Sequence, residues 1–472
     1  MKTRIKKIIT FVVIGIIFNN CIRKQENAFW IQNVNIINVK NGSVLANHNI
    51  KIADDVIVAI KKGEIQYNGK IIDGNNGFVI PGLWDMHVHL DMIDTVSIPL
   101  FMLNGVIGVR DMGGNTNFLN SVKKEINELH PIVKTAGAII ESPQFYKLIS
   151  KFLGKEIMES RVPFSSASNS KKLIDSLLEN GSDFIKIRTV ENHEAFKKLA
   201  NSARERGVKF TGHISPNLDI LSAVKLGLST IEHSDFFSIL SLDTTSKENL
   251  AKNISNESVY YTPTIITTQK SRLTSRKVLS EYINDSLNLN FDHRKYLSPK
   301  LIENWMMEYE MSKLESPMNW MEMTDDFFQF GRSLVNNDID LLSGTDSGVG
   351  LVIPGISLHQ ELEYMVKILR VSNLKALQSA TINATDHLAI KDQGIVAVGY
   401  KANLLILASN PLENISNTKK IISVIKNGKV YDETSRKEIL NGVHQKVNKE
   451  MQDYRFERIK KLRNSIKIFI NI

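Results

Sequence analysis

The chain has one cysteine, Cys21, among its 472 residues. A single thiol excludes an intramolecular disulfide, and it excludes metal sites built from cysteine alone. The most continuous apolar stretch near the start, residues 8–18, is shorter than the roughly 20 residues needed to cross a bilayer. With 42% hydrophobic residues the chain can bury a large core, so we expect a globular protein.

The first 21 residues have the composition of an export signal. Four basic residues precede the apolar stretch, and Cys21 follows it. This arrangement resembles a bacterial lipoprotein signal, which predicts a lipid on Cys21 and a protein exported to the cell envelope and anchored to a membrane. Phe18 and Asn20 depart from the small or aliphatic residues usual before such a cysteine, and an uncleaved anchor or an ordinary secretory signal are the alternatives.

The net charge of +9 is confined to the two ends of the chain. Residues 1–24 carry six basic and no acidic side chains, and residues 417–472 carry fourteen basic and six acidic ones. The region between them is therefore net acidic and has no basic stripe interleaved with aromatics. We expect no nucleic-acid partner.

The pattern of apolar and polar residues changes along the chain, and it predicts four structural parts after the signal segment. Residues 29–79 and 396–435 hold short β-like runs, and we expect the second block to complete the sheet begun by the first. Residues 80–395 alternate apolar strand-like runs with polar helical stretches, as βα units around a parallel sheet do. Residues 436–472 alternate charged and apolar residues at near-helical spacing, which predicts a helical C-terminal extension.

Eight such units fit the (β/α)8 barrel. The expected strands are "GLWDMHVHL", "GVIGVRDMGG", "PIVKTAGAI", "SDFIKIRT", "VKFTGHIS", "LSTIEHSD", "VYYTPTIIT" and "IDLLSGTDSG", most of them 20 to 30 residues apart. The wider gaps at 139–170 and 265–337 predict insertions over the face that carries the active site.

Six polar residues lie in these strands or at their ends, and in a barrel they would converge on one mouth: His87, His89, Lys186, His213, His233 and Asp346. Taken singly, each has an ordinary explanation, such as a hydrogen-bonded core histidine, a turn aspartate or an edge-strand lysine. Taken together, they would be a buried polar cluster that a divalent ion satisfies. We therefore expect a metal site.

Lys186 is the most informative of the six. Burial beside metal ions lowers the pKa of an ammonium, and the neutral amine can add carbon dioxide to give an anionic carbamate that bridges two cations. The alternative is a lysine that supports a one-metal site without binding the ion.

The motifs "PGLWDMHVH", "SDFIKI", "TGHIS", "STIEH" and "LSGTDSG", together with "VGYKANLLILASNPLENISNTKKIISVIKNGKVYD", resemble the metal-dependent amidohydrolase superfamily. The similarity is to its imidazolonepropionase-related, prolidase-like branch and spans about residues 30–435. It implies a TIM-like (β/α)8 barrel with a small β-sandwich domain built from both flanking segments. It also implies that His87, His89 and Asp346 hold one metal, that His213 and His233 hold the other, and that carbamylated Lys186 bridges them. Zinc is the expected metal, with manganese, iron and cobalt as alternatives.

Two positions depart from the usual pattern of the superfamily. "TGHIS" lacks a second histidine near His213, which concerns substrate contacts, and Asn403 replaces the usual aspartate of an "ADL" motif, which concerns packing.

The expected reaction is hydrolysis of a C–N bond, in an amide, a cyclic amide or a dipeptide, Xaa-Pro dipeptides included. A hydroxide bridging the two ions would attack, and Asp346 would act as general base and then as general acid. Cleavage of an ester, lactone or phosphotriester on the same site is an alternative, as is a non-catalytic surface lipoprotein. The oligomeric state stays open.

Substrate contacts are expected from residues at the ends of other strands. Arg110 could grip a substrate carboxylate or pair with Asp111 or another loop, and Tyr261, Thr262 and Thr264 could line the pocket or pack in the strand. For His359 and Glu361, a capping or surface role is preferred to substrate contact, and His193 has no assigned role.

Overall fold

The computed structural model describes residues 28–470, apart from 126, 154–156, 215–217, 234–238, 275 and 313–319. Side chains are not described at 151–158, 310–322 and 455–470. The predicted signal segment and the predicted lipidation site, Cys21, lie outside the described residues.

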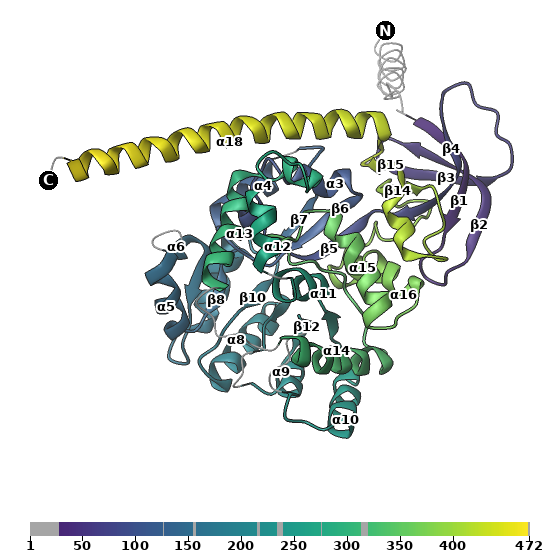
Figure 1. Ribbon diagram of the computed structural model, residues 1–472. Helices are drawn as coiled ribbons and strands as arrows, with labels where there is room; N and C mark the ends of the chain where they lie inside the picture. The colour runs from purple at the N-terminus through teal and green to yellow at the C-terminus, as the bar shows by residue number, and fades with distance from the viewer. Residues whose placement is uncertain are drawn as a thin grey trace, which may run out of the picture.

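A ring of parallel strands forms the centre of the molecule (Figure 1). Its first part is a three-stranded sheet of β5 (Leu83–Val88), β6 (Val106–Asp111) and β7 (Ile132–Thr135). The second part runs in the order β8 (Ile139–Glu141), β10 (Ile185–Ile187), β11 (Phe210–Gly212), β12 (Leu228–Glu232) and β13 (Tyr260–Thr262). All these neighbours pair in parallel.

Two details close the ring into a barrel of eight strand positions. β7 and β8 are successive halves of one strand, separated by a bend at Gly137, whose φ of 65° is in the left-handed region that favours glycine. Between β13 and β5, residues 340–343 supply the last strand, through a parallel bridge from Tyr261 to Leu341 and a 2.7 Å hydrogen bond from Met86 N to Ser343 O. The predicted barrel is therefore confirmed.

Amphipathic helices follow the strands and cover the barrel: α4 (Thr116–Lys124), α7 (Ser170–Glu179), α8 (His193–Glu205), α9 (Ile220–Lys225), α10 (Thr244–Ser255) and α14 (Trp320–Asn336). An asparagine or aspartate before α4, α7, α8, α9 and α10 accepts a backbone N–H of the first turn, as Asn192 does from Ala195. The apolar face of α8 then buries Phe196 and Leu199 against the strands. Local sequence thus sets where each unit turns from strand to helix.

Additional elements lie over the carboxyl ends of the strands. After β8 come α5 (Pro143–Leu153), α6 (Ile157–Ser160) and the short strand β9 (Arg161–Pro163). After β13 come α11 (Ile265–Thr267), η3 (Thr268–Arg272), α12 (Arg276–Asn284), η4 (Asp292–Tyr296) and α13 (Pro299–Ser312). Trp305 of α13 donates to Gly348 O at 3.2 Å, and Asn304 donates to Met92 O at 2.9 Å. α13 is thereby fixed next to the loops that follow β5 and the eighth strand.

The two ends of the barrel sequence join in one seven-stranded sheet, in the order β16-β15-β14-β4-β1-β2-β3. Its strands are β1 (Ala28–Ile37), β2 (Val44–Ala53), β3 (Val56–Lys62), β4 (Lys70–Pro81), β14 (Leu404–Leu407), β15 (Ile421–Lys426) and β16 (Lys429–Tyr431). β4 pairs antiparallel with β14, which brings Pro81 opposite Leu404. A β-rich domain built from both flanks is confirmed, and it lies beside the barrel (Figure 1).

The remaining helices connect the barrel to this sheet and extend beyond it. α2 (Leu90–Ile93) and α3 (Pro99–Leu103) follow β5, and α15 (Ile356–Ile368), α16 (Asn373–Ser379), α17 (Ile382–His387) and η5 (Ile415–Lys419) lie between the eighth strand and β15. α18 (Glu433–Ile470) starts at the sheet and runs past the barrel to the C-terminus (Figure 1). Val443 and Val447 of α18 pack on Val96.

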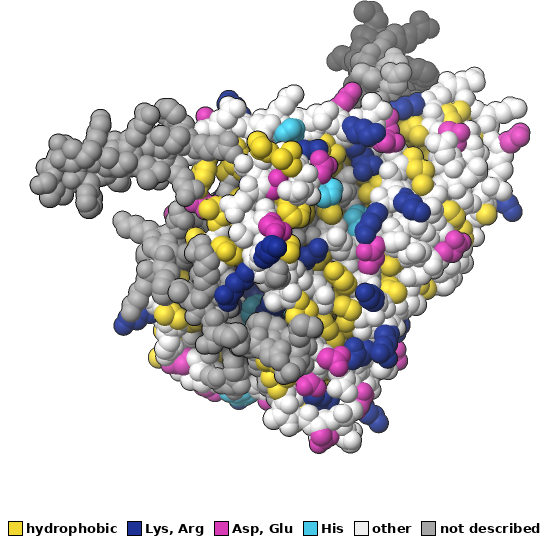
Figure 2. Space-filling model, viewed as in Figure 1, with side chains coloured by type: hydrophobic (Ala, Val, Ile, Leu, Met, Phe, Trp, Pro, Cys, Tyr) yellow, Lys and Arg dark blue, Asp and Glu magenta, His cyan; other side chains and the backbone are white. Residues whose placement is uncertain are grey.

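The surface view shows basic and acidic side chains interspersed over the sheet and the barrel (Figure 2). Among the residues described, we find no helix with the length and apolar character needed to cross a membrane.

Candidate metal centre

His87 and His89 lie at the carboxyl end of β5 and point to the same side. Side chains two residues apart on a strand share a face, and these two rings have centroids 5.7 Å apart. His87 is fully buried, whereas 17% of the His89 side chain is exposed. β5 therefore presents two imidazoles at the mouth of the barrel, one deeper than the other.

Asp346 reaches the same point from the end of the eighth strand. Its backbone N–H donates to His87 O at 2.6 Å, and its φ of 59° is unusual for a residue with a side chain. This geometry holds Oδ1 3.6 Å from His87 Nε2 and 3.4 Å from His89 Nε2. The three residues together offer ligand atoms within 4.8 Å of one another.

His213 and His233 form a second pair of facing nitrogens. His213 directly follows β11 and His233 directly follows β12, and their Nε2 atoms are 2.9 Å apart. The His233 ring lies 4.6 Å from the ring of His87, measured between centroids. Burial lowers the pKa of His213 well below its ordinary value, which favours the neutral ring that binds metal.

Lys186 is the middle residue of β10, and its side chain points into the barrel. It is 2% exposed, and its Nζ has no hydrogen-bond partner among the described residues. Burial is the main cause that lowers the pKa of Lys186 to about 8, against the attraction of Glu232 and Asp346. A buried amine without a hydrogen-bond partner is costly.

The Nδ1 atoms of three of the histidines are held by neighbours. His87 Nδ1 lies 2.8 Å from Glu232 Oε2, His89 Nδ1 lies 2.9 Å from Gly113 O, and His233 Nδ1 lies 2.9 Å from Thr264 Oγ1. An ionised carboxylate and a carbonyl can only accept, so Nδ1 of His87 and of His89 carries a hydrogen and donates it, and Nε2 is the atom of each ring that faces Asp346. His87 Nε2 has no hydrogen-bond partner within the described part of the chain. Such anchoring is typical of metal-binding histidines.

Glu232 is the functional residue that the sequence analysis missed. It is buried on β12 directly before His233, and its carboxylate accepts from Arg110 Nη2 at 2.7 Å and from Thr211 Oγ1 at 2.8 Å. Burial alone would raise the pKa of Glu232, but Arg110 and the hydrogen bond from His87 hold that pKa well below its usual range. The sequence contained a signal for this residue. Glu232 is two residues after Thr230, so both side chains lie on the same face of the strand. A charged side chain on a face directed into a barrel predicts a buried partner of opposite charge.

The predicted substrate contact of Arg110 does not agree with its position. The guanidinium is buried inside the barrel, where Nε donates to Met86 O at 2.6 Å and Nη2 binds Glu232. Its partner is thus neither Asp111 nor a loop residue. Since 1% of the side chain is exposed, Arg110 offers no surface to a substrate.

The three residues predicted to line the pocket from the seventh strand, Tyr261, Thr262 and Thr264, contact different parts of the molecule. Tyr261 belongs to the hydrophobic core, with its hydroxyl directed at Gly331 of α14, so it packs between the barrel and a helix. Thr262 is buried and accepts from Arg110 at 3.3 Å. Thr264, with a φ of 43°, places its hydroxyl on His233. The interpretation as strand packing holds for Tyr261, and Thr264 contacts a candidate ligand.

His359, Glu361 and His193, which were given no role in the chemistry, lie outside the candidate metal centre. His359 contacts Thr418 Oγ1 at 3.0 Å and Asn104 O at 2.9 Å, and Glu361 accepts from the N–H groups of Ile265 and Ile266. His193 is the first residue of α8.

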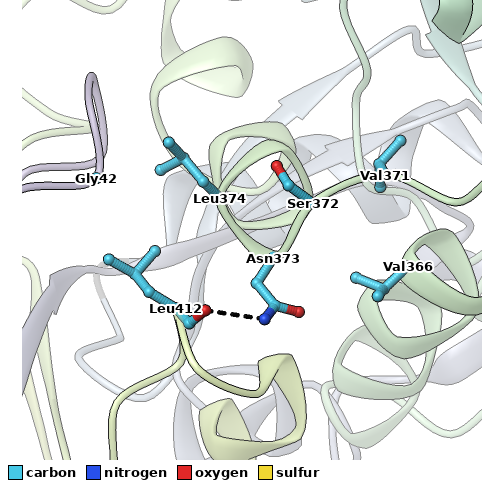
Figure 3. A pocket seen from close by; sticks show the side chains of 7 residues that line it. All are labelled: Gly42, Val366, Val371, Ser372, Asn373, Leu374 and Leu412. Atoms are coloured by element: carbon cyan, nitrogen blue, oxygen red, sulfur yellow. Dashed lines mark hydrogen bonds between the residues drawn. The ribbon is translucent and has the colours of Figure 1, made fainter.

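A pocket of about 480 Å³ lies away from these residues, between the β1–β2 turn and α15–α16 (Figure 3). Its walls are apolar or neutral, and Asn373 Nδ2 donates to Leu412 O across it at 2.9 Å. Titratable side chains are absent from the residues described as lining it, namely Gly42, Val366, Val371, Ser372, Asn373, Leu374 and Leu412. The pocket therefore holds no group for acid–base or metal chemistry.

The donor set at the barrel mouth fits divalent cations. Neutral imidazoles and a carboxylate are the ligands that zinc and its neighbours take, and the five residues come from four different strand ends. Burial raises the pKa of Asp346, but electrostatic interactions with His87, His233, His89 and Lys186 outweigh it and lower that pKa to about 2, so the carboxylate is ionised at neutral pH. Two of the buried side-chain atoms that lack a hydrogen-bond partner among the described residues, Lys186 Nζ and His87 Nε2, belong to this group of residues.

Comparisons with known proteins give the same fold. The sequence model of the amidohydrolase family matches residues 78–431. A solved Xaa-Pro dipeptidase with methionine in its active site is 22% identical, covering 86% of this chain and 100% of that one, with a TM-score of 0.62. Ochratoxinase from A. niger is 17% identical (87% and 96% covered, TM-score 0.63), and the bottromycin amidohydrolase AH is 17% identical (89% and 91% covered, TM-score 0.67). No curated protein matches the sequence.

Proposed function

This chain belongs to the amidohydrolase family, and on that basis we propose that it is a metal-dependent hydrolase that cleaves a C–N bond at the mouth of its barrel. The observation that supports this proposal most directly is the shared orientation of the imidazoles. Glu232 and Gly113 hold Nδ1 of His87 and of His89, and this leaves both Nε2 atoms beside the Asp346 carboxylate. His87 Nε2 is buried without a hydrogen-bond partner among the described residues, and a bound metal ion would satisfy it.

We propose two divalent ions, with zinc as the first choice. His87, His89 and Asp346 would hold one, His213 and His233 would hold the other, and Lys186 would bridge them as a carbamate. The neutral amine needed for carbamylation is accessible because the lowered pKa of Lys186, about 8, leaves part of the side chain uncharged near neutral pH. The carbamate would also remove the unpaired buried amine.

When bound, such ions lower the pKa of water and polarise a carbonyl. The contribution of the chain is proton transfer and orientation. Asp346, ionised at neutral pH, accepts the proton of the attacking water at its carboxylate and passes it to the departing amine nitrogen. Glu232 and Gly113 fix the His87 and His89 rings through their Nδ1 atoms, so both Nε2 atoms stay directed at the Asp346 carboxylate.

For the substrate class we propose an amide, a cyclic amide or a dipeptide. Support comes from the similarity to a solved Xaa-Pro dipeptidase and to the bottromycin amidohydrolase, whose names describe C–N hydrolases. The test is a panel of dipeptides, lactams and lactones incubated with the zinc-loaded protein, with Asp346→Asn as the inactive control. Hydrolysis of an amide that falls at least about 100-fold in Asp346→Asn supports the proposal. If only the lactones were hydrolysed, the protein would instead be an esterase-type metallohydrolase.

We further propose that the protein is exported and held at a membrane of the cell envelope by a lipid on Cys21. The basic and apolar N-terminal residues before Cys21 support this proposal. Labelling of expressing bacteria with a radioactive fatty acid tests it: the wild-type chain should carry label in the membrane fraction, and Cys21→Ala should not.

A further inference from the structure

Arg188 lies at the mouth of the barrel, two residues after Lys186 and directly after the carboxyl end of β10. Its backbone N–H donates to Ile140 O at 3.0 Å, so the extended pairing of β10 with β8 continues to this residue. Side chains at 186 and 188 then lie on the same face of the strand. Lys186 is buried, whereas 37% of the Arg188 side chain is exposed. The guanidinium therefore sits between the buried centre and solvent.

Fixed elements hold this guanidinium in place. Arg188 Nη1 lies 3.6 Å from Oε1 of Glu141, the buried last residue of β8, and its guanidinium carbon is 4.7 Å from the centroid of the Phe145 ring in α5. Arg161 of β9 contacts the same oxygen of Glu141, and Thr189 donates to the other at 2.6 Å. One carboxylate is thus shared by two guanidinium groups, and the local charge is positive.

That positive charge acts on the candidate metal centre. Arg188 interacts electrostatically with Asp346, and its charge is also felt at Lys186 and His213. Arg110, the other arginine near the centre, is enclosed in the barrel and bound to Glu232. Arg188, unlike Arg110, is consequently a guanidinium that a molecule entering the mouth can reach.

We propose that Arg188 binds the carboxylate of the substrate, so that the enzyme acts on dipeptides or N-acyl amino acids with a free α-carboxylate. This inference rests on the proposed function and narrows its substrate class. The planar fork of an arginine matches a carboxylate in bidentate geometry, and such a contact, placed one step outward from the reacting centre, orients the amide bond toward Asp346. Amides and cyclic amides without an anionic group would lack this contact.

The test compares dipeptides with their own C-terminal amides in three forms of the metal-loaded protein: wild type, Arg188→Gln and Arg161→Gln. Loss of a charge-assisted hydrogen bond changes affinity about 10- to 100-fold, so wild type should prefer each dipeptide over its amide by about that factor in kcat/KM. Arg188→Gln should abolish the preference by raising KM for dipeptides and should leave the amides unchanged. Arg161→Gln, which removes the other cation on Glu141, should keep the preference.

A binding measurement separates this inference from the proposed function. Calorimetry of L-proline and L-methionine, each against its amide, reports carboxylate recognition without turnover. Binding of the free amino acids that is lost in Arg188→Gln and kept in Arg161→Gln supports carboxylate recognition by Arg188. If such binding is found but no peptide is cleaved, the proposed hydrolase function is wrong and the inference about Arg188 stands. Equal use or binding of acids and amides, or equal losses in both variants, overturns the inference and leaves the hydrolase proposal standing.

Discussion

His87 Nδ1 and Glu232 Oε2 lie 2.8 Å apart in the interior of the barrel. The other carboxylate oxygen of Glu232 binds Arg110 at 2.7 Å, so a buried ion pair stands directly behind a candidate metal ligand. The pair costs desolvation free energy, and its position indicates what it does: it fixes the ring plane and the tautomer of His87.

Glu232→Gln is therefore expected to weaken metal binding. Loss of the carboxylate behind a histidine ligand typically costs about 10- to 100-fold in metal affinity, and Arg110 would be left without its counter-charge, which lowers stability as well. Competition with a fluorescent zinc chelator measures the affinity. His359→Gln is the matched control, because that buried histidine contacts Thr418 and Asn104 outside the centre. It should lower the melting temperature and leave zinc affinity unchanged.

Thr264→Val tests the support of His233. Valine has the shape of threonine but no hydroxyl, so His233 Nδ1 loses its partner at 2.9 Å and we expect about a tenfold loss in affinity for metal. Thr264→Ser keeps the hydroxyl and should bind metal like wild type. Equal metal affinity in the valine and serine variants would show that the hydroxyl does not position the ring.

Two buried carboxyl groups, Glu361 and Asp85, should each contribute a loss of stability as the pH rises from about 5 to 8. Burial raises the pKa of Glu361 to about 8 and that of Asp85 to about 7. In this window the unfolded chain has released protons that the folded protein retains, so each such group lowers the free energy of unfolding by up to about 1.4 kcal/mol per pH unit. Chemical denaturation at several pH values measures the slope. Glu361→Gln should remove the share of this loss that Glu361 contributes, whereas Glu363→Gln, a change at the salt bridge to Lys419 on the same helix, should not.

Bound metal should stabilise the fold. A ligand present at about 1,000 times its dissociation constant adds about 4 kcal/mol to the free energy of unfolding, so removal of metal with a chelator should lower the melting temperature. Added zinc should restore it. In His89→Ala, whose site lacks one ligand, the same zinc addition should give a smaller rise. A melting temperature that is the same with and without chelator would contradict a resident metal.

The architecture could be predicted because it follows from local patterns. Apolar strand-like runs alternate with polar helical stretches through residues 80–395, and βα units around a parallel sheet have this alternation. The six polar residues at the strand ends could be named for the same reason, since parallel strands of a closed barrel end at one face.

The contacts between those residues could not be predicted from the sequence. Arg110 and Glu232 are 122 positions apart and meet only because their strands face each other across the barrel. Sequence parity places each side chain inside but does not tell which buried partner it meets, and so for Arg110 the sequence offered only a substrate carboxylate, Asp111 or another loop. Likewise, nothing local to Tyr261 indicates that its ring turns outward to α14.

The most direct test of the central claim is the metal content of the purified protein, measured by inductively coupled plasma mass spectrometry for wild type and Lys186→Ala. The bridged pair predicts about two equivalents of divalent metal in wild type and one or fewer in Lys186→Ala, with the variant still folded by circular dichroism. Wild-type protein that takes up no metal from zinc-containing buffer, or a Lys186→Ala variant that retains both ions, would contradict the account.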